Sequence, residues 1–548
     1  MKTKKNKNTQ EKSNKKHIST KKHALARTQS GSGYRRKFLH FLANGSVISE
    51  RWDLTQIELH TYHNKKKKHR KFSEFFRKLP DFQKAVVVYA LVSTLLIVSL
   101  GAYFVGRILY VSLTHDKYDH NNLSAVLKQP NNITMVGDGM IASPNGDYFV
   151  FQNNADNNYV YYSGNIYRIL TMDYDGSITI ISDQPVSSYL FTTKAAEFKD
   201  TEIYRWLNYD ANGSIIIDDI LDSGVFYNSL YKPEEYLKPA VSFCTLSDQE
   251  GNCLKTTEAT VGLLNINQYL EAGASNSFLN NGNYFWTLSY NEQGSIYTIN
   301  SEGSLLEVVP YGVTTVECYG IRPVLVLKPN TKFLSGEGTA DEPYLVADQE
   351  YLATKGETLL NQRFSGEYVL FSDTLYRIVT TNAKYTELIM EGVIDEEEDF
   401  DVAFSASAYD NNMFDSTKRD NLAYFLNHSY FDSLADNHLL VNGVNYIGTF
   451  SDQSQYQYKA QFQEVSNEKI SLPKIGGLYN TNLHSEIGYW TIDVYNLNGY
   501  QVVTLNQKNQ AVVTLITQKR QVKTVIYISS EAVIDGGSGL SGDPYTIK

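Results

Sequence analysis

The feature that most restricts how this chain can fold is an internal duplication. A block containing Tyr167 and Arg168 recurs 209 residues later at Tyr376 and Arg377, with the same spacing to its neighbours. Four further blocks recur in the same order, at offsets of 219, 204, 204 and 201 residues. Agreement of this kind is hard to obtain by chance, and it indicates two tandem modules with one architecture.

The repeated blocks define framework positions that the two copies share. The Trp-Leu-Asn block is typical of a short helix whose Asn lies near the helix end, where Asn tolerates the left-handed conformation, and the later Trp of each copy is most simply a core anchor. The Gly-x-Gly…Pro-Tyr block that ends each copy predicts a turn and a last strand, and it lacks the Lys-Ser/Thr of a phosphate loop. We expect packing rather than ligand contact at most of these positions. They are Tyr167, Arg168, Trp206, Asn208, Trp286, Arg322, Pro343 and Tyr344 in the first copy, and Tyr376, Arg377, Asn427, Trp490, Pro544 and Tyr545 in the second.

Beyond residue 107 the composition is that of a β-rich protein. The chain holds 41 tyrosines, and short apolar runs such as 167–170 and 178–181 are separated by Asn, Ser, Thr and Gly. Aromatic and β-branched residues favour strands, whereas the small polar residues favour turns. Each module is therefore predicted to be rich in β-strands.

The charge of the chain changes sign along its length. Residues 1–83 hold 22 Lys and Arg against 6 Asp and Glu, a net charge of +16, which leaves -26 for the rest of a chain whose total is -10. The Lys-rich run 65–71 would also suit a phosphate backbone. Its position beside an apolar segment argues against a nucleic-acid partner.

That segment, residues 85–106, carries no charge and lies between Lys84 and Arg107. At about 1.5 Å per residue a helix of this length would cover roughly 30 Å, the thickness of a bilayer core. It has no amphipathic face, and the basic region before it is too long for a cleaved signal peptide. We expect one transmembrane helix, with the basic tail in the cytoplasm beside anionic lipid and the C-terminal part outside the cell membrane.

These features predict an α+β fold class, with one transmembrane helix followed by two tandem β-rich modules. The basic tail has few large apolar side chains and is expected to be largely disordered. The predicted segments are 1–83 for the cytoplasmic tail, 84–110 for the transmembrane helix, 111–134 for a linker, 135–346 for the first extracellular module, 347–360 for a second linker and 361–548 for the second module.

The order YRIL, WLN, VGLLNINQY (261–269), FWTLS and IRPVLVL (321–327) resembles a family of uncharacterised bacterial envelope modules, common in Gram-positive lineages. Those modules are similar to the C-type-lectin-like fold that formylglycine-generating enzymes share. The resemblance covers most of 135–346, but in the second copy KIGGL (474–478) replaces the VGLL block and KTVI (523–526) replaces IRPV. It implies C-type-lectin-like modules with an envelope role, and it carries no catalytic motif.

Three cysteines, Cys244, Cys253 and Cys318, lie in the first module. Cys244 and Cys253 could close a small loop by a disulfide outside the cell, which would stabilise the fold by roughly 2 to 4 kcal/mol. Cys318 would then be left over, so reduced and buried cysteines are the alternative. None of the three has a Cys-x-x-Cys or zinc spacing.

The sequence shows no motif for catalysis or for a cofactor beyond residue 107. The histidines there form no HExxH arrangement, no GxSxG elbow occurs, and Asp173, Asp175 and Gly176 lack the later Glu of a calcium loop. We therefore expect no enzyme, no cofactor and no metal. An extracellular enzyme that acts on glycan or peptide with two acidic residues is the alternative; a deep pocket with convergent acids would favour it, and shallow loop surfaces would favour binding.

The expected function is that of a single-pass, membrane-anchored cell-surface protein that binds or organises envelope components. Its Tyr-rich and Asn-rich loops would contact an envelope glycan, a wall polymer or a surface protein. A Golgi-type transferase has the same order of tail, anchor and outer part, and Asn132 and Asn212 begin formal glycosylation sequons. The duplicated modules do not fit the nucleotide-sugar fold that such a transferase needs.

Overall fold

The structure is a computed structural model that divides into two compact units, Met1–Val111 and Ser112–Lys548. It describes residues 77, 80–81 and 122–548, except 144–145, 193–195, 209–215, 218–219, 222, 248–252, 310–317, 395–400, 408–411, 449–463, 479–486, 497–498 and 507–509. The predicted cytoplasmic tail and the segment 84–110 thus lie outside the described residues, apart from three positions. Within the second unit we call residues 122–346 the first half, 347–367 the connecting segment and 368–548 the second half.

Each half is built on a large sheet, and the two large sheets have the same strand order. In the first half the order is β11 (Val261–Leu263), β16 (Pro323–Leu327), β5 (Ile178–Ser182), β4 (Asn165–Asp173), β3 (Tyr159–Tyr162), β18 (Tyr344–Val346) and β17 (Phe333–Ser335), with β2 (Tyr148–Gln152) and β1 (Gly139–Ala142) added beside β4. In the second half it is β25 (Ile470–Ser471), β30 (Val525–Ser529), β21 (Tyr385–Met390), β20 (Thr374–Thr381), β19 (Tyr368–Phe371), β32 (Tyr545–Ile547) and β31 (Ile534–Gly536).

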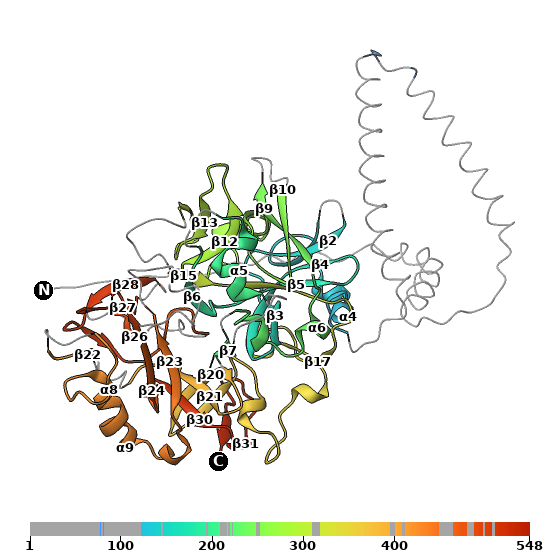
Figure 1. Ribbon diagram of the computed structural model, residues 1–548. Helices are drawn as coiled ribbons and strands as arrows, with labels where there is room; N and C mark the ends of the chain where they lie inside the picture. The colour runs from blue at the N-terminus through green and yellow to red at the C-terminus, as the bar shows by residue number, and fades with distance from the viewer. Residues whose placement is uncertain are drawn as a thin grey trace, which may run out of the picture. The chain divides into compact units, whose positions relative to one another are not determined.

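Smaller sheets accompany the large ones. The first half has β10 (Cys253–Ala259), β9 (Val241–Ser247), β12 (Phe285–Tyr290), β13 (Ile296–Ile299) and β14 (Leu305–Val308) in order, with β15 (Cys318–Ile321) and β6 (Ser187–Leu190) alongside. The second half has β22 (Asp401–Ala403), β29 (Lys519–Gln521), β26 (Tyr489–Val494), β27 (Gln501–Leu505) and β28 (Ala511–Leu515). Two separate hairpins are β7 (Ile216–Ile217) with β8 (Ile220–Leu221), and β23 (Gly443–Ile447) with β24 (Glu464–Glu468). Figure 1 shows β26, β27 and β28 side by side in the red part of the chain, and β9 beside β10 in the green part.

The helices of the described residues are short, which corrects the predicted fold class. They are α4 (Leu123–Leu127), α5 (Glu202–Leu207), α6 (Pro233–Tyr236), α7 (Ile266–Glu271), α8 (Leu422–Phe425), α9 (Phe431–Ser433) and a π-helical turn at Leu426–Tyr430, besides single 3-10 turns. Strands make up 41% of the structure and helices 16%, so the fold is mostly β rather than α+β. The physical reason is the supply of Tyr, Ile, Val and Thr in short alternating runs, which favours sheets.

The expectation of a single-pass membrane protein is corrected by the same observation. Across 77, 80–81 and the described parts of 122–548, no helix is both long and apolar enough to cross a membrane. The α-helices α5 and α7 have 6 residues each, about 9 Å of the roughly 30 Å that a bilayer core requires. This finding conflicts with the membrane, transmembrane and signal-anchor assignments, and it is made on the described residues, outside which the predicted segment 84–110 lies.

The Gly-x-Gly…Pro-Tyr tails close each half by bringing its last strand back to an early strand, β3 in the first half and β19 in the second. β18 pairs in parallel with β3, with Tyr344 beside Val160, and β32 pairs in parallel with β19, with Tyr545 beside Val369. A Cβ at Gly336, where φ is +102°, would lie 2.0 Å from the carbonyl oxygen of Pro343. Only glycine fits this crossing of the tail over its own end.

The two halves are joined by the connecting segment, whose residues Tyr351, Arg363 and Glu367 are buried. Arg363 donates from Nη2 to Oε1 of Glu367 at 2.7 Å and from Nε to Oε2 at 3.1 Å. The ring of Tyr351 stacks on Phe364 with centroids 5.3 Å apart, and its hydroxyl accepts a hydrogen bond from the Gly164 amide at 3.1 Å. Since one hydrophobic core includes residues of both halves, the domain bounds drawn from the sequence stay a prediction.

Candidate functional site

A cleft of about 910 Å³ lies between the two halves. The first half lines it with the β3–β4 hairpin, the chain after β5, a loop before β12 and the tail, while the second half contributes β19, β20, the chain after β21 and its own tail. The lining residues are Tyr159, Tyr161, Gly164, Asn165, Ile166, Asp183, Gln184, Pro185, Val186, Asn281, Gly282, Asn283, Ala340, Asp341, Pro343, Tyr368, Arg377, Glu391, Leu540, Ser541, Gly542 and Asp543.

Tyr159, Arg168 and Asp183 form a first triad at the cleft wall. The Arg168 guanidinium lies 3.8 Å from the centroid of the Tyr159 ring, and its Nη1 donates to Oδ1 of Asp183 at 3.4 Å. Nε and Nη2 of Arg168 donate to Oδ1 of Asn158 at 2.7 Å and to the carbonyl of Ala155 at 2.6 Å. Burial lowers the pKa of Arg168, and the Asp183 carboxylate opposes that shift. The arginine thus fixes the tyrosine ring from behind.

The second half repeats this arrangement with Tyr368, Arg377 and Glu391. The Arg377 guanidinium lies 4.8 Å from the centroid of the Tyr368 ring, and its Nε lies 3.9 Å from Oε2 of Glu391. The backbone carbonyl of Gly366 accepts from the same Nε at 3.2 Å. Burial raises the pKa of Tyr368, so this phenol stays protonated at neutral pH. The tyrosine and the acidic residue of each triad therefore line the same cleft, one pair from each half.

Amide side chains occupy the first-half side of the cleft. Asn281 donates from Nδ2 to the carbonyl oxygen of Asp183 at 2.7 Å, and Asn283 donates to Oε1 of Gln184 at 3.0 Å. These bonds fix the loop before β12 onto the chain after β5 while both amide groups remain part of the lining. Held amides of this kind are suited to hydroxyl and acetamido groups, since each amide offers donors and acceptors.

Each tail brings one carboxylate to the cleft, Asp341 from the first and Asp543 from the second. Both residues are exposed, and among the described residues neither carboxylate has a hydrogen-bond or ion-pair partner. Together with Asp183 and Glu391 they face a single lining guanidinium, that of Arg377. The described wall is therefore acidic.

Two buried cations stand behind the cleft at corresponding positions. Arg322 is 0% exposed and donates to the carbonyl oxygens of Ser182 at 2.9 Å and Leu279 at 2.6 Å. Lys523 takes its place in the second half, also 0% exposed. Burial lowers the pKa of Arg322 to about 10 and that of Lys523 to about 8. Arg322 supports the wall from inside the core and does not line the cleft.

The remaining framework residues serve the fold. Tyr167 and Tyr376 are 0% exposed in the large sheets. The indole Nε1 of Trp286 donates to the carbonyl of Tyr189 at 2.9 Å, and that of Trp490 donates to Val402 at 2.8 Å. The side chains of Asn208 and Asn427 form hydrogen bonds with the backbone of β11 and β25. The tail residues are Pro343, Tyr344, Pro544 and Tyr545, of which Pro343 alone lines the cleft among described residues.

The structure changes one correspondence drawn from the sequence. The counterpart of β11 is β25, because both strands pair with the matching neighbours β16 and β30. The KIGGL segment instead contacts the first half: Gly476 donates to the carbonyl of Ser188 at 2.9 Å, and its carbonyl accepts from Nε1 of Trp206 at 2.9 Å. Trp206 is thus a contact between the halves as well as a core residue.

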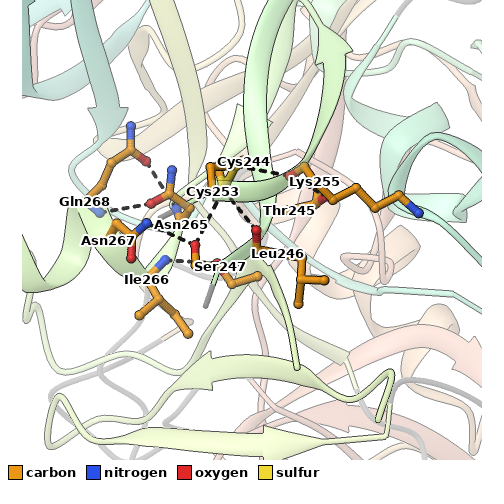
Figure 2. Close-up of a disulfide and its surroundings, with 11 residues drawn as sticks. Cys244, Thr245, Leu246, Ser247, Cys253, Lys255, Asn265, Ile266, Asn267 and Gln268 are labelled. Atoms are coloured by element: carbon orange, nitrogen blue, oxygen red, sulfur yellow. Dashed lines mark hydrogen bonds between the residues drawn. A yellow bond between two sulfur atoms is a disulfide. The ribbon is translucent and has the colours of Figure 1, made fainter. Parts of the chain in front are cut away.

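Cys244 and Cys253 form a disulfide across the β9–β10 hairpin, and Cys318 is a buried free cysteine. Figure 2 shows the disulfide beside the start of α7. There Asn267 donates from Nδ2 to Oγ of Ser247 at 2.9 Å, which fixes the hairpin to the helix. The cysteines do not line the cleft.

No group of His, Cys, Asp and Glu suited to a metal ion occurs in the parts of the chain that the structure describes. No protein-family model, curated protein or solved structure matches the chain. The function is therefore argued from the cleft itself.

Sequence reasoning missed most of the cleft residues. Tyr159 and Tyr368 stood in the first repeated block but were not chosen as site residues. Asp183 follows Arg168 by 15 positions and Glu391 follows Arg377 by 14. A search for acidic residues 14 or 15 positions after the two arginines would have found both.

Proposed function

We propose that Ser112–Lys548 is a binding module that holds a linear polysaccharide of amino sugars in the cleft between its halves. The supporting observation is the composition of the wall, in which arginine-backed rings of Tyr159 and Tyr368 stand among amides and carboxylates. Tyrosine rings offer apolar faces to the C–H faces of sugars, while amides and carboxylates bond to hydroxyl and amino groups. A concave surface of this size is typical of a ligand site.

Charge narrows the class of polysaccharide. The carboxylates of Asp341 and Asp543 have no partner among the described residues, and an acidic polymer placed beside them would be repelled. Amino groups complement them, and acetamido groups suit the amides of Asn281 and Asn283. We therefore favour glucosamine-type units, N-acetylated or with free amino groups, over uronic acids and phosphate polymers.

The disulfide supports a location in an oxidising compartment, since such bonds persist outside the reducing cytosol. This is consistent with the predicted resemblance to bacterial envelope modules and with an envelope polysaccharide as the ligand. A surface protein as ligand is the less favoured partner, because the cleft is concave and polar rather than flat and apolar.

Titration calorimetry with the full chain tests the proposal. The probes are β-1,4-linked hexamers of N-acetylglucosamine and of glucosamine. The acidic comparison is hyaluronan, in which glucuronate alternates with N-acetylglucosamine. We expect binding to at least one hexamer and none to hyaluronan. Tyr368→Ala should weaken hexamer binding at least about tenfold, or ~1.4 kcal/mol, whereas Tyr500→Ala, at a side chain 60% exposed and outside the cleft, should not. Absence of binding to both hexamers would refute the proposal.

Four carboxylates at one cleft favour a glycan hydrolase as the second candidate. Asp183 and Glu391 are paired with Arg168 and Arg377, which leaves Asp341 and Asp543 for acid and base roles. Mass spectrometry of the hexamers after incubation decides between the two functions. Shortened products that disappear with Asp341→Asn or Asp543→Asn would replace the binding proposal by hydrolysis.

A further inference from the structure

We infer that the cleft holds two units of one polymer at the same time, one against each half, so that an oligomer rather than a single sugar is the minimum ligand. The inference rests on the proposed function and deepens it. It starts from the two triads. Tyr159 and Tyr368 occupy the first position of β3 and β19, strands with the same place in the two large sheets, and both rings line the one cleft.

The correspondence extends beyond the tyrosines. Asp183 and Glu391 come directly after β5 and β21, and their backbone amides donate to matching carbonyls, those of Ile166 at 3.0 Å and Leu375 at 2.8 Å. The tails also contact the two tyrosines in the same way. The backbone amide of Tyr159 donates to the carbonyl of Gly338 at 2.8 Å, and the backbone amide of Tyr368 donates to the carbonyl of Gly539 at 2.9 Å. Each tail therefore lies at the same position against its own tyrosine.

A fold that presents the same ring, acid and tail loop twice to one cavity presents the same chemistry twice. A ligand that contacts both walls must therefore carry the complementary groups twice. A polymer with a short repeating unit does so. The cavity has room for this, because about 910 Å³ is near the upper end of the roughly 300–1,000 Å³ range of small-molecule sites.

The junction keeps the two walls together. The buried pair Arg363–Glu367 and the stack of Tyr351 on Phe364 hold the second half against the β3–β4 hairpin of the first. With both subsites fixed, the second unit of an oligomer binds as an intramolecular step at an effective concentration on the order of millimolar. Affinity should therefore rise steeply until both subsites are filled and then level off.

The experiment is a length series with the full chain. β-1,4-linked glucosamine and N-acetylglucosamine oligomers of one to six units are titrated into the wild type and into Tyr159→Ala, Tyr368→Ala and Tyr500→Ala. We expect the better-bound series to gain at least about tenfold in affinity between one and four units, and this gain to disappear in both cleft variants. Tyr159→Phe and Tyr368→Phe, which keep the ring, should restore the gain, and matching thermal midpoints would show that the variants fold.

The outcomes separate the inference from the proposed function. Equal affinity of the wild type for one unit and for four, or a loss confined to one of the two tyrosine variants, would overturn the two-subsite inference and leave a one-site binding module. If the wild type binds no oligomer of either series, the proposed function fails and the inference fails with it.

Discussion

Asn208 holds Val261 by two hydrogen bonds of opposite direction. The Val261 amide donates to Oδ1 at 2.9 Å, and Nδ2 donates to the Val261 carbonyl at 3.0 Å. Asn427 does the same to Ile470, at 3.0 and 2.8 Å. The asparagine that ends each Trp/Phe-Leu-Asn block thus stands in for a strand partner at the edge strands β11 and β25.

The first prediction follows from these bonds. Asn208→Ala leaves the buried amide and carbonyl of Val261 without these partners, at a cost of about 1–3 kcal/mol for each group. We expect the free energy of unfolding to fall by ~3 kcal/mol, measured by urea denaturation. Asn427→Ala should act similarly in the second half. The control Asn154→Ala, at an exposed position, should change stability by less than about 0.5 kcal/mol; an equal effect of the control and Asn208→Ala would contradict the prediction.

The buried pair at the junction gives the second prediction. Arg363→Met removes the ion-pair partner of Glu367, a carboxyl that is 0% exposed and keeps hydrogen bonds from the Tyr545 hydroxyl and the Phe364 amide. Breaking such a buried ion pair costs about 3–5 kcal/mol. Burial already raises the pKa of Glu367, with Arg363 opposing the shift. The double variant Arg363→Met/Glu367→Leu should recover most of the loss in thermal or chemical denaturation. As the control, Lys355→Met removes an exposed 3.9 Å ion pair with Asp535 and should cost under about 1 kcal/mol. A double variant no more stable than Arg363→Met would argue against the pairing.

The third prediction concerns pH and Lys523. Its pKa is about 8 in the folded protein against 10.5 for an ordinary lysine, because burial disfavours the ammonium; Glu391 opposes the shift and Arg377 adds to it. Between these values the unfolded chain binds a proton that the folded chain has released, so stability rises with pH, by at most about 1.4 kcal/mol per unit. Below pH 8 Lys523 is protonated in both the folded and the unfolded chain, so its contribution to the free energy of unfolding no longer changes with pH.

Denaturation midpoints between pH 7 and 9.5 test this, a range that stays below the titration of free tyrosines near 10. Lys523→Met should abolish the rise above pH 8, and Lys519→Met, with a side chain 69% exposed, should keep it. If both variants keep the rise, Lys523 is not its source.

The disulfide gives the fourth prediction. Cys244 and Cys253 are 9 positions apart, and closing a loop this short stabilises by roughly 2–3 kcal/mol. Reduction, or the variant Cys244→Ser/Cys253→Ser, should lower the thermal midpoint while sugar binding at the cleft persists, since neither cysteine lines it. Thiol titration of the unreduced chain should find no reactive thiol in the native state and one after denaturation, because Cys318 is only 1% exposed. Two or more thiols in the denatured chain would rule out the disulfide.

Much of the fold was open to prediction because the repeated blocks are apolar and local. A strand such as β4 and its counterpart β20 need only their own alternating residues to be recognised. The Trp-Leu-Asn block was correctly expected to form a short helix, α5. Its Asn208 was expected near the helix end and is the residue that caps α5, with φ -116° and ψ 142° rather than the left-handed conformation that Asn tolerates there. This extended backbone accompanies its long-range bonds to Val261, which no local pattern encodes.

The cleft could not be predicted in the same way. Its wall joins Tyr159 to Asp543, residues that the fold brings together across more than 380 positions of sequence. The carboxylates of the tails looked like ordinary turn residues, because their role depends on how one half lies against the other. That arrangement depends on contacts of Arg363, Tyr351 and Phe364 in the connecting segment and on the contact between Trp206 and Gly476, and none of these contacts follows from the repeated blocks.

The parallel closure of each half, with Tyr344 beside Val160 and Tyr545 beside Val369, has a consequence for how such a chain arises. The start of β3 or β19 and the end of the last strand that pairs with it are separated by little more than one short strand, ~10 Å. A stretch of gene that encodes one half can be copied in tandem with only a brief spacer, and neither copy has to be rethreaded. Evolution is then free to alter the spacer and the loops of each copy separately, while the pairing of β18 with β3 and of β32 with β19 keeps both copies intact.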